Sequence, residues 1–327
     1  MFKRPRLSAV NRLVNALAML ALLFLATACG SPSEAPEINA PIAPQPTVSD
    51  GLVLPAVWST RDLGSPIESI AVAGELGSTI AVAYADGDLQ FFNFEGDRIT
   101  DKAEVSVAKL GDGRYLLLSG VPVTLFPGVS RDGALKVYIH GGQLAEPLVY
   151  DLDIGMDSKI AGLCSAPPEL AEDGVLRLAF WLTDDPSNLH YGRVVEIGEE
   201  LVFLRDQPTK AAGRISACML NETDATVYSA PALSVAALTR RGHRHIVTLD
   251  TSGNFGVSKD GGTLQMLTIK DGITVKMAKV PVDMAGTGDT RGGGYPGGIL
   301  VFAGEDEAGG HRLVFVDPSE ITLTAFE

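Results

Sequence analysis

The densest basic segment in the body of the chain is the heptapeptide TRRGHRH. Its three arginines, Arg240, Arg241 and Arg244, have the chemistry of an anion clamp, because a guanidinium group donates two parallel hydrogen bonds to a phosphate or a carboxylate. His243 and His245 lie two residues apart and would share one side of a strand, but no third metal ligand accompanies them. The alternative is a solvated loop at the edge of a sheet. We take the arginines as a candidate phosphate-binding group.

Other signals of chemistry are sparse. The sequence has no nucleophile-elbow serine motif, no phosphate-binding P-loop and no zinc-spaced His-Glu pair. The segment Asp151–Asp157 spaces its acids in the manner of a calcium loop, but it lacks the glycine placement and the later glutamate of an EF-hand, and a solvated turn is the alternative. A net charge of −14 argues against nucleic acid as the main partner. The sequence therefore assigns no catalytic residue.

The first residues have the pattern of an export signal. A basic start is followed by the apolar run Ala16–Leu25, which is shorter than the roughly 20 residues that cross a membrane, and small residues then precede Cys29. This pattern resembles the bacterial lipoprotein signal, in which the cysteine becomes the lipid-bearing N-terminus; cleavage without lipidation and a retained anchor are the alternatives. Because Gly30 is not the aspartate that commonly retains lipoproteins at the inner membrane, we expect an outer-membrane lipoprotein facing the periplasm or the cell exterior.

The chain is expected to divide into three parts. Residues 1–28 form the signal peptide, residues 29–50 a tether and residues 51–327 the folded body. The tether is rich in proline and has too few apolar groups to offset the entropy of ordering. Removal of four basic residues with the signal leaves 22 basic against 40 acidic residues, so acyl chains on Cys29 would have to hold the protein to the lipid bilayer.

The elements that must position any site follow one repeated pattern. An apolar strand, a Gly/Asp/Asn turn and a second strand recur, as in Thr79–Phe94 and Val129–His140, and this is the signal of a β-hairpin. Several second strands are apolar on both faces, as expected where sheets stack face to face. We therefore predict an all-β, six-bladed β-propeller, with a β-sandwich pair as the alternative. We expect Leu52–Trp58 to close the ring by pairing with the last blade.

The spacing of the repeats supports this prediction with one exception. The first strands recur at intervals of 48, 45, 55, 30 and 53 residues, mostly near the roughly 40–50 residues of a four-stranded blade. The 30-residue interval indicates a truncated blade or a misplaced boundary. The alanine-rich segment Pro231–Arg241 is the best candidate for a short helix. The first strands are expected to begin near Ile67, Tyr115, Ile160, Ile215, His245 and Gly298.

Several of these segments resemble the β-propeller phytases. The segment IAVAYADGDLQFFNFEGDRI looks like an early strand, turn and strand of that family, and RISACMLNE looks like one of its inner strands. The segments LTIKDGITV and YPGGILVFAGE are similar to its Asp-Gly-Ile-Asp stretch and its final strand pair, and Ile160–Thr183 matches a strand with a cysteine before an acidic loop. The resemblance covers most of the body and rests on the segments taken together.

The resemblance implies a calcium-dependent phosphohydrolase whose carboxylates hold several Ca²⁺ ions at the mouth of the propeller. Such ions need many hard oxygen ligands. Here Ser65, Ser216 and Thr274 stand where the family has acids, so most of the expected metal ligands are missing. The acids that remain as candidate metal ligands, for Ca²⁺, are Asp271, Glu305 and Asp306.

Two cysteines of the body fall at similar places in successive predicted blades. Cys164 and Cys218 each lie in a predicted inner strand, so neighbouring blades could bring them within bonding distance. An exported location permits oxidation. We predict a disulfide between them, with two buried free thiols as the alternative.

The function that these observations favour is binding. We expect a cell-envelope lipoprotein with a phytase-like β-propeller, a degenerate phosphohydrolase that acts as a binding module. Its partner would be a small anionic ligand such as an inositol phosphate, or an outer-membrane protein. The alternatives are an active Ca²⁺-dependent 3-phytase-like enzyme and an assembly scaffold of the outer membrane.

Overall fold

The computed structural model describes residues 51–74, 76–142, 144–167, 175–221, 224–240, 242–289 and 295–322. All of them belong to one compact unit, Asn39–Glu327. The expected signal peptide, Cys29 and the tether lie outside the described residues, and so does Arg241. In the described ranges the regular structure is almost entirely β, and helix α2 (Ser319–Thr322) is a single turn.

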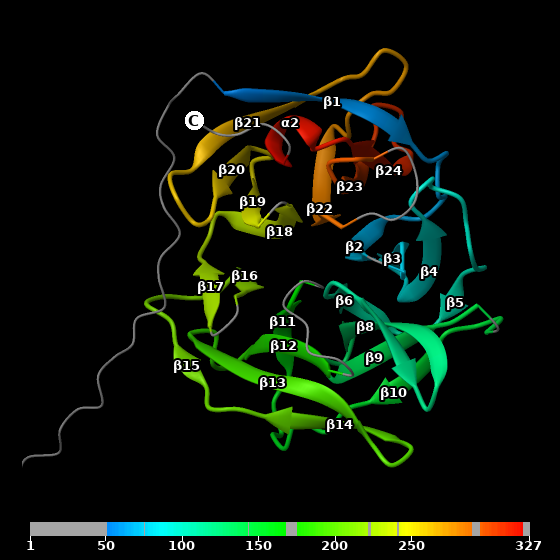
Figure 1. Ribbon diagram of the computed structural model, residues 1–327, viewed down its shortest axis with the longest axis vertical. Helices are drawn as coiled ribbons and strands as arrows, with labels where there is room; N and C mark the ends of the chain where they lie inside the picture. Colours follow the sequence, from blue (N-terminus) through cyan, green and yellow to red (C-terminus); the bar gives the residue numbers. More distant parts are fainter. Residues whose placement is uncertain are drawn as a thin grey trace, which may run out of the picture. The chain divides into compact units, whose positions relative to one another are not determined.

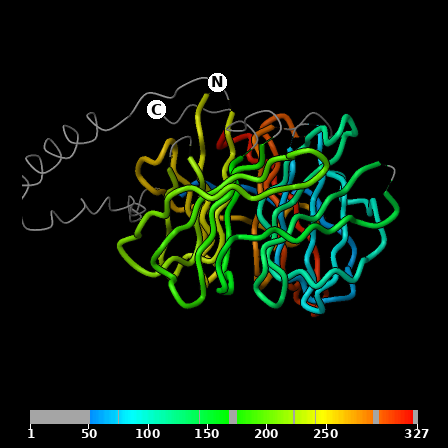
Figure 2. The backbone as a smooth tube through the Cα atoms, turned by 90° about the horizontal axis from the view of Figure 1, so that it is seen from below, coloured from blue at the N-terminus to red at the C-terminus, as the bar shows by residue number. Residues whose placement is uncertain are grey.

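Hydrogen-bonded strands form six blades that follow one another around a common centre (Figure 1). The side view shows the strands of neighbouring blades running side by side, with turns at both ends (Figure 2). The predicted six-bladed β-propeller is confirmed, and the two stacked sheets of a β-sandwich are not what forms.

Each blade is named here by its place in the chain. Blade 1 contains β2 (Ile67–Ala73), β3 (Thr79–Tyr84), β4 (Asp88–Asn93) and β5 (Ala103–Glu104). Blade 2 contains β6 (Val107–Leu110), β7 (Arg114–Leu118), β8 (Val121–Ser130), β9 (Leu135–His140) and β10 (Leu148–Asp151). Blade 3 contains β11 (Ile160–Ser165), β12 (Val175–Leu182), β13 (Asn188–Ile197), β14 (Glu200–Arg205) and β15 (Thr209–Lys210).

The second half of the ring is less regular. Blade 4 contains β16 (Ala217–Leu220) and β17 (Ala225–Tyr228). Blade 5 contains β18 (Ala232–Arg240), β19 (His243–Asp250), β20 (Phe255–Lys259) and β21 (Gln265–Lys270). Blade 6 contains β22 (Val280–Thr287), β23 (Ile299–Glu305) and β24 (His311–Val316).

Strand β1 (Leu52–Ser59) closes the ring between blades 5 and 6. Its first half pairs in parallel with β21, where Leu52 lies opposite Leu267, and its second half pairs antiparallel with β24, where Trp58 lies opposite Phe315. In Figure 1 it extends from one of these blades to the other. The pairing of the first strand with the last blade was predicted; the parallel pairing with blade 5 was not.

Blade 4 is the truncated blade that the 30-residue interval indicated, because it has two strands in the described part of the chain. Three predicted blade boundaries were nevertheless wrong. Tyr115, His245 and Gly298 fall at the second strands of their blades in chain order, since β6, β18 and β22 precede them. The predicted helix at Pro231–Arg241 is also wrong, because this segment is mostly strand β18. Ala236 and Ala237 are buried between blades, where small side chains let sheets approach closely.

The core consists of apolar layers between successive blades. Between blades 1 and 2, for example, the small side chains of Ala71 and Ala83 pack with Phe91, Phe126 and Tyr138, and all five are fully buried. Larger clusters fill the contacts between blades 2 and 3 and between blades 5 and 6. Among the helices that the structure describes, none has the length and apolarity that a membrane crossing requires.

Candidate functional site

A cavity of about 370 Å³ lies at the centre of the ring. The innermost strands or their flanking residues from all six blades line it, and each blade contributes a polar side chain. In blade order these side chains are Ser69, Asp112, Ser165, Ser216, Ser234 and Asp283. In a propeller the innermost strands surround a central channel and do not pack against one another across the axis. Their inward-facing side chains therefore line this central space.

Asp283 ties blade 6 to blade 1 at the cavity wall. Its Oδ2 atom accepts hydrogen bonds from the Ser69 hydroxyl at 2.9 Å and from the Ile70 amide at 2.8 Å, and its Oδ1 atom accepts one from the Met284 amide at 2.8 Å. Ser69 is buried and its Oγ atom also accepts a hydrogen bond from the amide of Leu110 in blade 2. One carboxylate and one hydroxyl therefore organise three consecutive blades.

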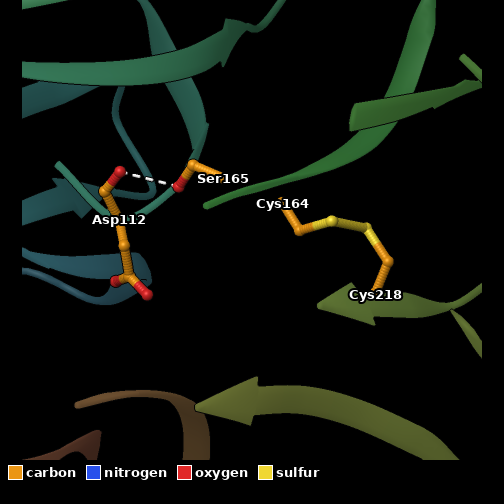
Figure 3. The surroundings of a disulfide bond; sticks show 4 residues. All are labelled: Asp112, Cys164, Ser165 and Cys218. Carbon is orange, nitrogen blue, oxygen red and sulfur yellow. Dashed lines mark hydrogen bonds between the residues drawn. A yellow bond between two sulfur atoms is a disulfide. The ribbon is translucent and has the colours of Figure 1, made fainter. Parts of the chain in front are cut away.

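Asp112 has the same role between blades 1, 2 and 3. Its Oδ1 atom accepts a hydrogen bond from the Val72 amide at 3.0 Å, and its main-chain oxygen accepts one from the Ser165 hydroxyl at 2.6 Å. Figure 3 shows the Asp112 carboxylate on the side of the residue that is turned away from Ser165. Because Asp112 lines the cavity, it places a negative charge at the cavity wall.

A disulfide joins blades 3 and 4. Cys164 in β11 and Cys218 in β16 are bonded, with their Cα atoms 5.7 Å apart, which is the pairing expected from the sequence (Figure 3). Blades 5 and 6 are joined by the Ser234 hydroxyl, which donates to the Met284 carbonyl at 2.9 Å. Blades 4 and 5 meet through apolar packing of Met219, Tyr228 and Ile246 and through the hydrogen bond that Arg244 Nη1 donates to Asn221 Oδ1. Five of the six blade contacts thus have a hydrogen bond or a disulfide between residues at or next to the cavity wall.

The charges of the cavity wall favour some ligands over others. The cavity wall includes two carboxylate residues, Asp112 and Asp283. It also includes one lysine, Lys109, which is exposed to solvent. Around these charges lie the four serine hydroxyls. The balance is one negative charge, so the wall attracts a cation and offers hydroxyl partners to neutral polar groups.

The arginines predicted to clamp an anion do not converge. They lie on the β18–β19 hairpin, where Arg240 pairs with His243 and Arg244 pairs with Thr239. Consecutive pairs along a hairpin point to opposite faces, so the two arginines point apart. Arg240 Nη1 donates to the Gly288 carbonyl at 3.0 Å, and Arg244 Nη1 donates to Asn221 Oδ1 at 2.8 Å. The prediction that these arginines bind one anion together is wrong for Arg240 and Arg244, the two that the structure describes.

The predicted metal ligands also lie apart from the cavity wall. Asp271 Oδ1 accepts a hydrogen bond from the Met277 amide within its own loop. Asp306 accepts bonds from the amides of Ala308 and Gly310 and pairs with Arg312 Nε at 2.6 Å. These contacts, with that from Gly310 the largest, lower the pKa of Asp306. Across the described ranges no three His, Cys, Asp or Glu side chains gather as a metal site would require, so Asp271, Glu305 and Asp306 do not form one there.

Sequence reasoning missed Asp112 and Asp283, the two acids of the cavity. Asp283 was the more visible of them, because it is the single charge within the apolar segment VPVDMAGT. An acid inside a buried strand needs partners, so that position indicates a structural or binding role. Asp112 lies between two glycines and resembles an ordinary turn residue in the sequence. Ser216, which stands where the phytase resemblance calls for an acid, does line the cavity.

Comparison with known proteins adds little to this geometry. No family model matches the chain, and no curated protein matches it. Solved structures with a similar fold include AofleA from Arthrobotrys oligospora, at 12% identity and a TM-score of 0.46 over 75% of this chain and 80% of that one. A triple mutant of the same protein has 12% identity and a TM-score of 0.48 over 77% and 84%. The Aleuria aurantia lectin, described as a six-bladed β-propeller with a novel mode of fucose recognition, has 9% identity and a TM-score of 0.45 over 78% and 92%. The fold is therefore assigned from this chain's own sheets.

Proposed function

We propose that this protein is a binding module of the cell envelope that holds a small neutral or cationic polar molecule in its axial cavity. The observation that carries the proposal is the cavity wall, to which each of the six blades contributes a serine or an aspartate. Carboxylates and hydroxyls fixed by hydrogen bonds between blades are preorganised, so little conformational entropy is lost when a ligand binds. Amino and hydroxyl groups on the ligand are the natural partners of such a wall.

The charge of the wall argues against the inositol phosphate that the phytase resemblance suggests. A highly phosphorylated ligand would meet Asp112 and Asp283 with Lys109 as the one ammonium group among the lining residues. Like charges in a confined cavity repel strongly, because little water separates them. Phosphate hydrolysis would also need activated water, and the acids that the resemblance points to are engaged in their own loops.

The placement in the envelope rests on the sequence of the first thirty residues. Acylation of Cys29 and anchoring in the outer membrane are part of the proposal. Incorporation of labelled palmitate into the wild-type protein supports them, and a Cys29→Ala protein that still carries the label contradicts them.

Ligand binding is tested by thermal unfolding in the presence of candidate molecules. The set comprises neutral sugars and polyols, primary and quaternary amines, and inositol hexakisphosphate as the anionic comparison. A ligand at 100 times its Kd stabilises the native state by about 2.7 kcal/mol, which raises the Tm measurably. We expect at least one neutral or cationic compound to do so.

The matched controls replace one carboxylate at a time. Asp283→Asn keeps an oxygen for Ser69 and Ile70 but removes the charge from the cavity, and Asp306→Asn makes the same change in a loop outside it. The ligand-induced shift should be reduced by the first change and kept by the second. Stabilisation by the hexakisphosphate alone, or a shift that Asp283→Asn leaves intact, would contradict the proposal.

A further inference from the structure

A groove of about 270 Å³ lies beside the truncated blade 4. One wall is formed by Tyr228 at the end of β17, and the other by the face of blade 5 that is turned toward blade 4. The inner part of that face is covered, since Ile246 and Ala237 pack with Met219 and Tyr228. The outer part, at β20 and β21, lines the groove where further strands of a four-stranded blade 4 would pack.

The floor of the groove suits an extended chain. It is formed by Thr248, Gly256 and Ser258, whose small side chains let a backbone approach closely, and by Leu264 and Met266. The register places Thr248 opposite Gly256, and Gly256 opposite Met266, so these three residues form one row across the sheet. This row is flat, partly apolar and about two strand spacings of ~4.8 Å wide.

Strand β17 offers a backbone edge at the same groove. It pairs with β16 on one side, and the described residues supply no strand on its other side. Because the Tyr228 carbonyl accepts a hydrogen bond from the Ser216 amide, the amide and carbonyl of Val227 point to the opposite edge. The hydroxyl of Tyr191 in blade 3 forms a hydrogen bond with the backbone of Ala225. The unpaired part of the β17 edge therefore lies toward Tyr228. An unpaired edge of this kind recruits an extended segment.

The first described residue of the chain, Gly51, lies next to this groove. Strand β1 pairs in parallel with β21, and Gly51 lies against Met266, since a Cβ atom added to Gly51 would be 3.0 Å from the Met266 carbonyl oxygen. Met266 also lines the groove. The residues just before Gly51 therefore start at its edge. Seven residues in extended form reach about 23 Å, which is more than the two strand spacings to Thr248 require.

The composition of that segment is compatible with binding in the groove. Residues 44–49 carry no charge and Asp50, next to Gly51, carries one, so in a chain whose net charge is −14 the acidic surface repels the segment only weakly. Pro44 and Pro46 lack amide hydrogens, but in an extended chain they remove donors from one edge only. The amides of Gln45, Thr47 and Ser49 remain on the other edge and can pair with β17.

We propose that residues 44–50 bind in this groove and supply blade 4 with an additional strand. This goes beyond ligand binding at the axis and revises the expectation that all of residues 29–50 form an unattached tether. The part of the N-terminal segment that stays outside the propeller then ends near residue 43.

Cysteine cross-linking in the full chain, with Cys29 replaced by serine, tests the proposal. Gln45→Cys is combined with Thr248→Cys in the groove, or with Thr268→Cys, an exposed position of β21 outside it. A docked segment should link to position 248 about tenfold faster than to position 268, because docking raises the local concentration of one thiol at the other. Mass spectrometry of the linked peptides and non-reducing gels give the two rates.

A second measurement needs no substitution in the groove. Hydrogen exchange of the full chain should show protected amides at residues 45, 47 and 49 and faster exchange at residues 39–43. Equal or faster linking to position 268, together with unprotected amides at 45–49, overturns the proposal. Links formed between two chains rather than within one overturn it as well, because the groove would then belong to a dimer.

Discussion

Cys164 and Cys218 are 54 residues apart in the sequence, and their disulfide fastens the two-stranded blade 4 to the complete blade 3. Blade 4 has the least backbone pairing of the six, so it depends most on links to its neighbours. On its other side the contact with blade 5 consists of apolar packing and the Arg244–Asn221 hydrogen bond, without an interblade disulfide in the described residues. The disulfide therefore holds the blade that has the fewest backbone hydrogen bonds of its own.

Removal of this bond should destabilise the protein substantially. On the chain-entropy model a loop of this length contributes about 4 kcal/mol. We expect the double variant Cys164→Ala/Cys218→Ala to unfold at clearly lower urea concentration than wild type, and reductant to lower only the wild-type midpoint. Equal midpoints with and without reductant, or two free thiols in the denatured body, would show that the bond does not form in solution.

The free energy of unfolding should also depend strongly on the Asp283 carboxylate. In Asp283→Ala the buried Ser69 hydroxyl and the Ile70 amide lose their acceptor, and each unsatisfied group costs about 1–3 kcal/mol. Asp283→Asn keeps an oxygen in place and should be milder. Urea denaturation of both variants measures the difference. Asp306→Ala, in a solvent-exposed loop, serves as the control and should have a smaller effect than Asp283→Ala; the reverse order would refute the assigned role.

Three buried histidines, His140, His190 and His245, should make stability depend on pH near neutrality, because burial lowers the pKa of His245 as well as that of the other two. His140 stacks on Phe91 at 4.8 Å and His190 stacks on Phe180 at 5.4 Å between ring centroids. Burial lowers the pKa of both imidazoles below 6.5. Within the described residues His140 Nδ1 and His190 Nε2 have no hydrogen-bond partner.

The sign follows from proton binding. Below about pH 6.5 the unfolded chain binds protons at these histidines that the native state does not bind, so stability is full above that pH and falls as the pH is lowered. Urea midpoints between pH 8 and pH 5 should decline, and His140→Phe and His190→Phe should each flatten the decline. The part of the pH dependence that survives both replacements should be removed by changing His245, and a full dependence that persists without any of the three histidines would assign the effect to other groups.

The sequence predicted the architecture well because its turns are explicit. Gly and Asp at the hairpin turns, as at Asp86-Gly87, require the positive φ that those residues tolerate, and Gly87 has a φ of 96°. Hairpins that recur at a regular spacing are typical of a propeller, so the fold could be predicted from them. The apolar segment Leu52–Trp58 has to pair with another strand, so its role in closing the ring could be predicted as well. The disulfide followed from the blade order, because it required only that two inner strands be neighbours.

The site could not be predicted with equal success because it depends on which face each side chain takes. One residue of register decides whether Arg240 and Arg244 converge or point apart, and the sequence of the hairpin does not settle it. The alanines of β18 have high helix propensity, yet tertiary packing against blade 4 makes the segment a strand. Asp112 and Asp283 come together through the closure of the ring, which joins residues 171 positions apart.

Calcium is expected to have little effect on the stability of the protein and to support little phosphate release. We expect the mature protein to hydrolyse phytate at less than about a tenth of the rate of an intact β-propeller phytase, because a site without clustered carboxylates binds Ca²⁺ weakly and does not activate water. Asp271 and Asp306 already accept backbone hydrogen bonds in separate loops, and Ser216 at the cavity supplies an oxygen without a charge to balance Ca²⁺. Millimolar CaCl₂ should leave the Tm nearly unchanged.

The assay is phosphate release across a Ca²⁺ titration, with an intact family enzyme as the positive control and Asp271→Asn and Asp283→Asn as variants. The two variants separate the possible sites, because Asp271 belongs to the loop after β21 and Asp283 to the cavity wall. Saturable turnover within about tenfold of that of the control enzyme, if Asp271→Asn abolished it, would contradict this prediction. It would show that the outer loops form a phytase site. Loss of that turnover in Asp283→Asn instead would place calcium chemistry in the cavity, where the negative balance of the wall would then serve to hold the ion rather than a ligand.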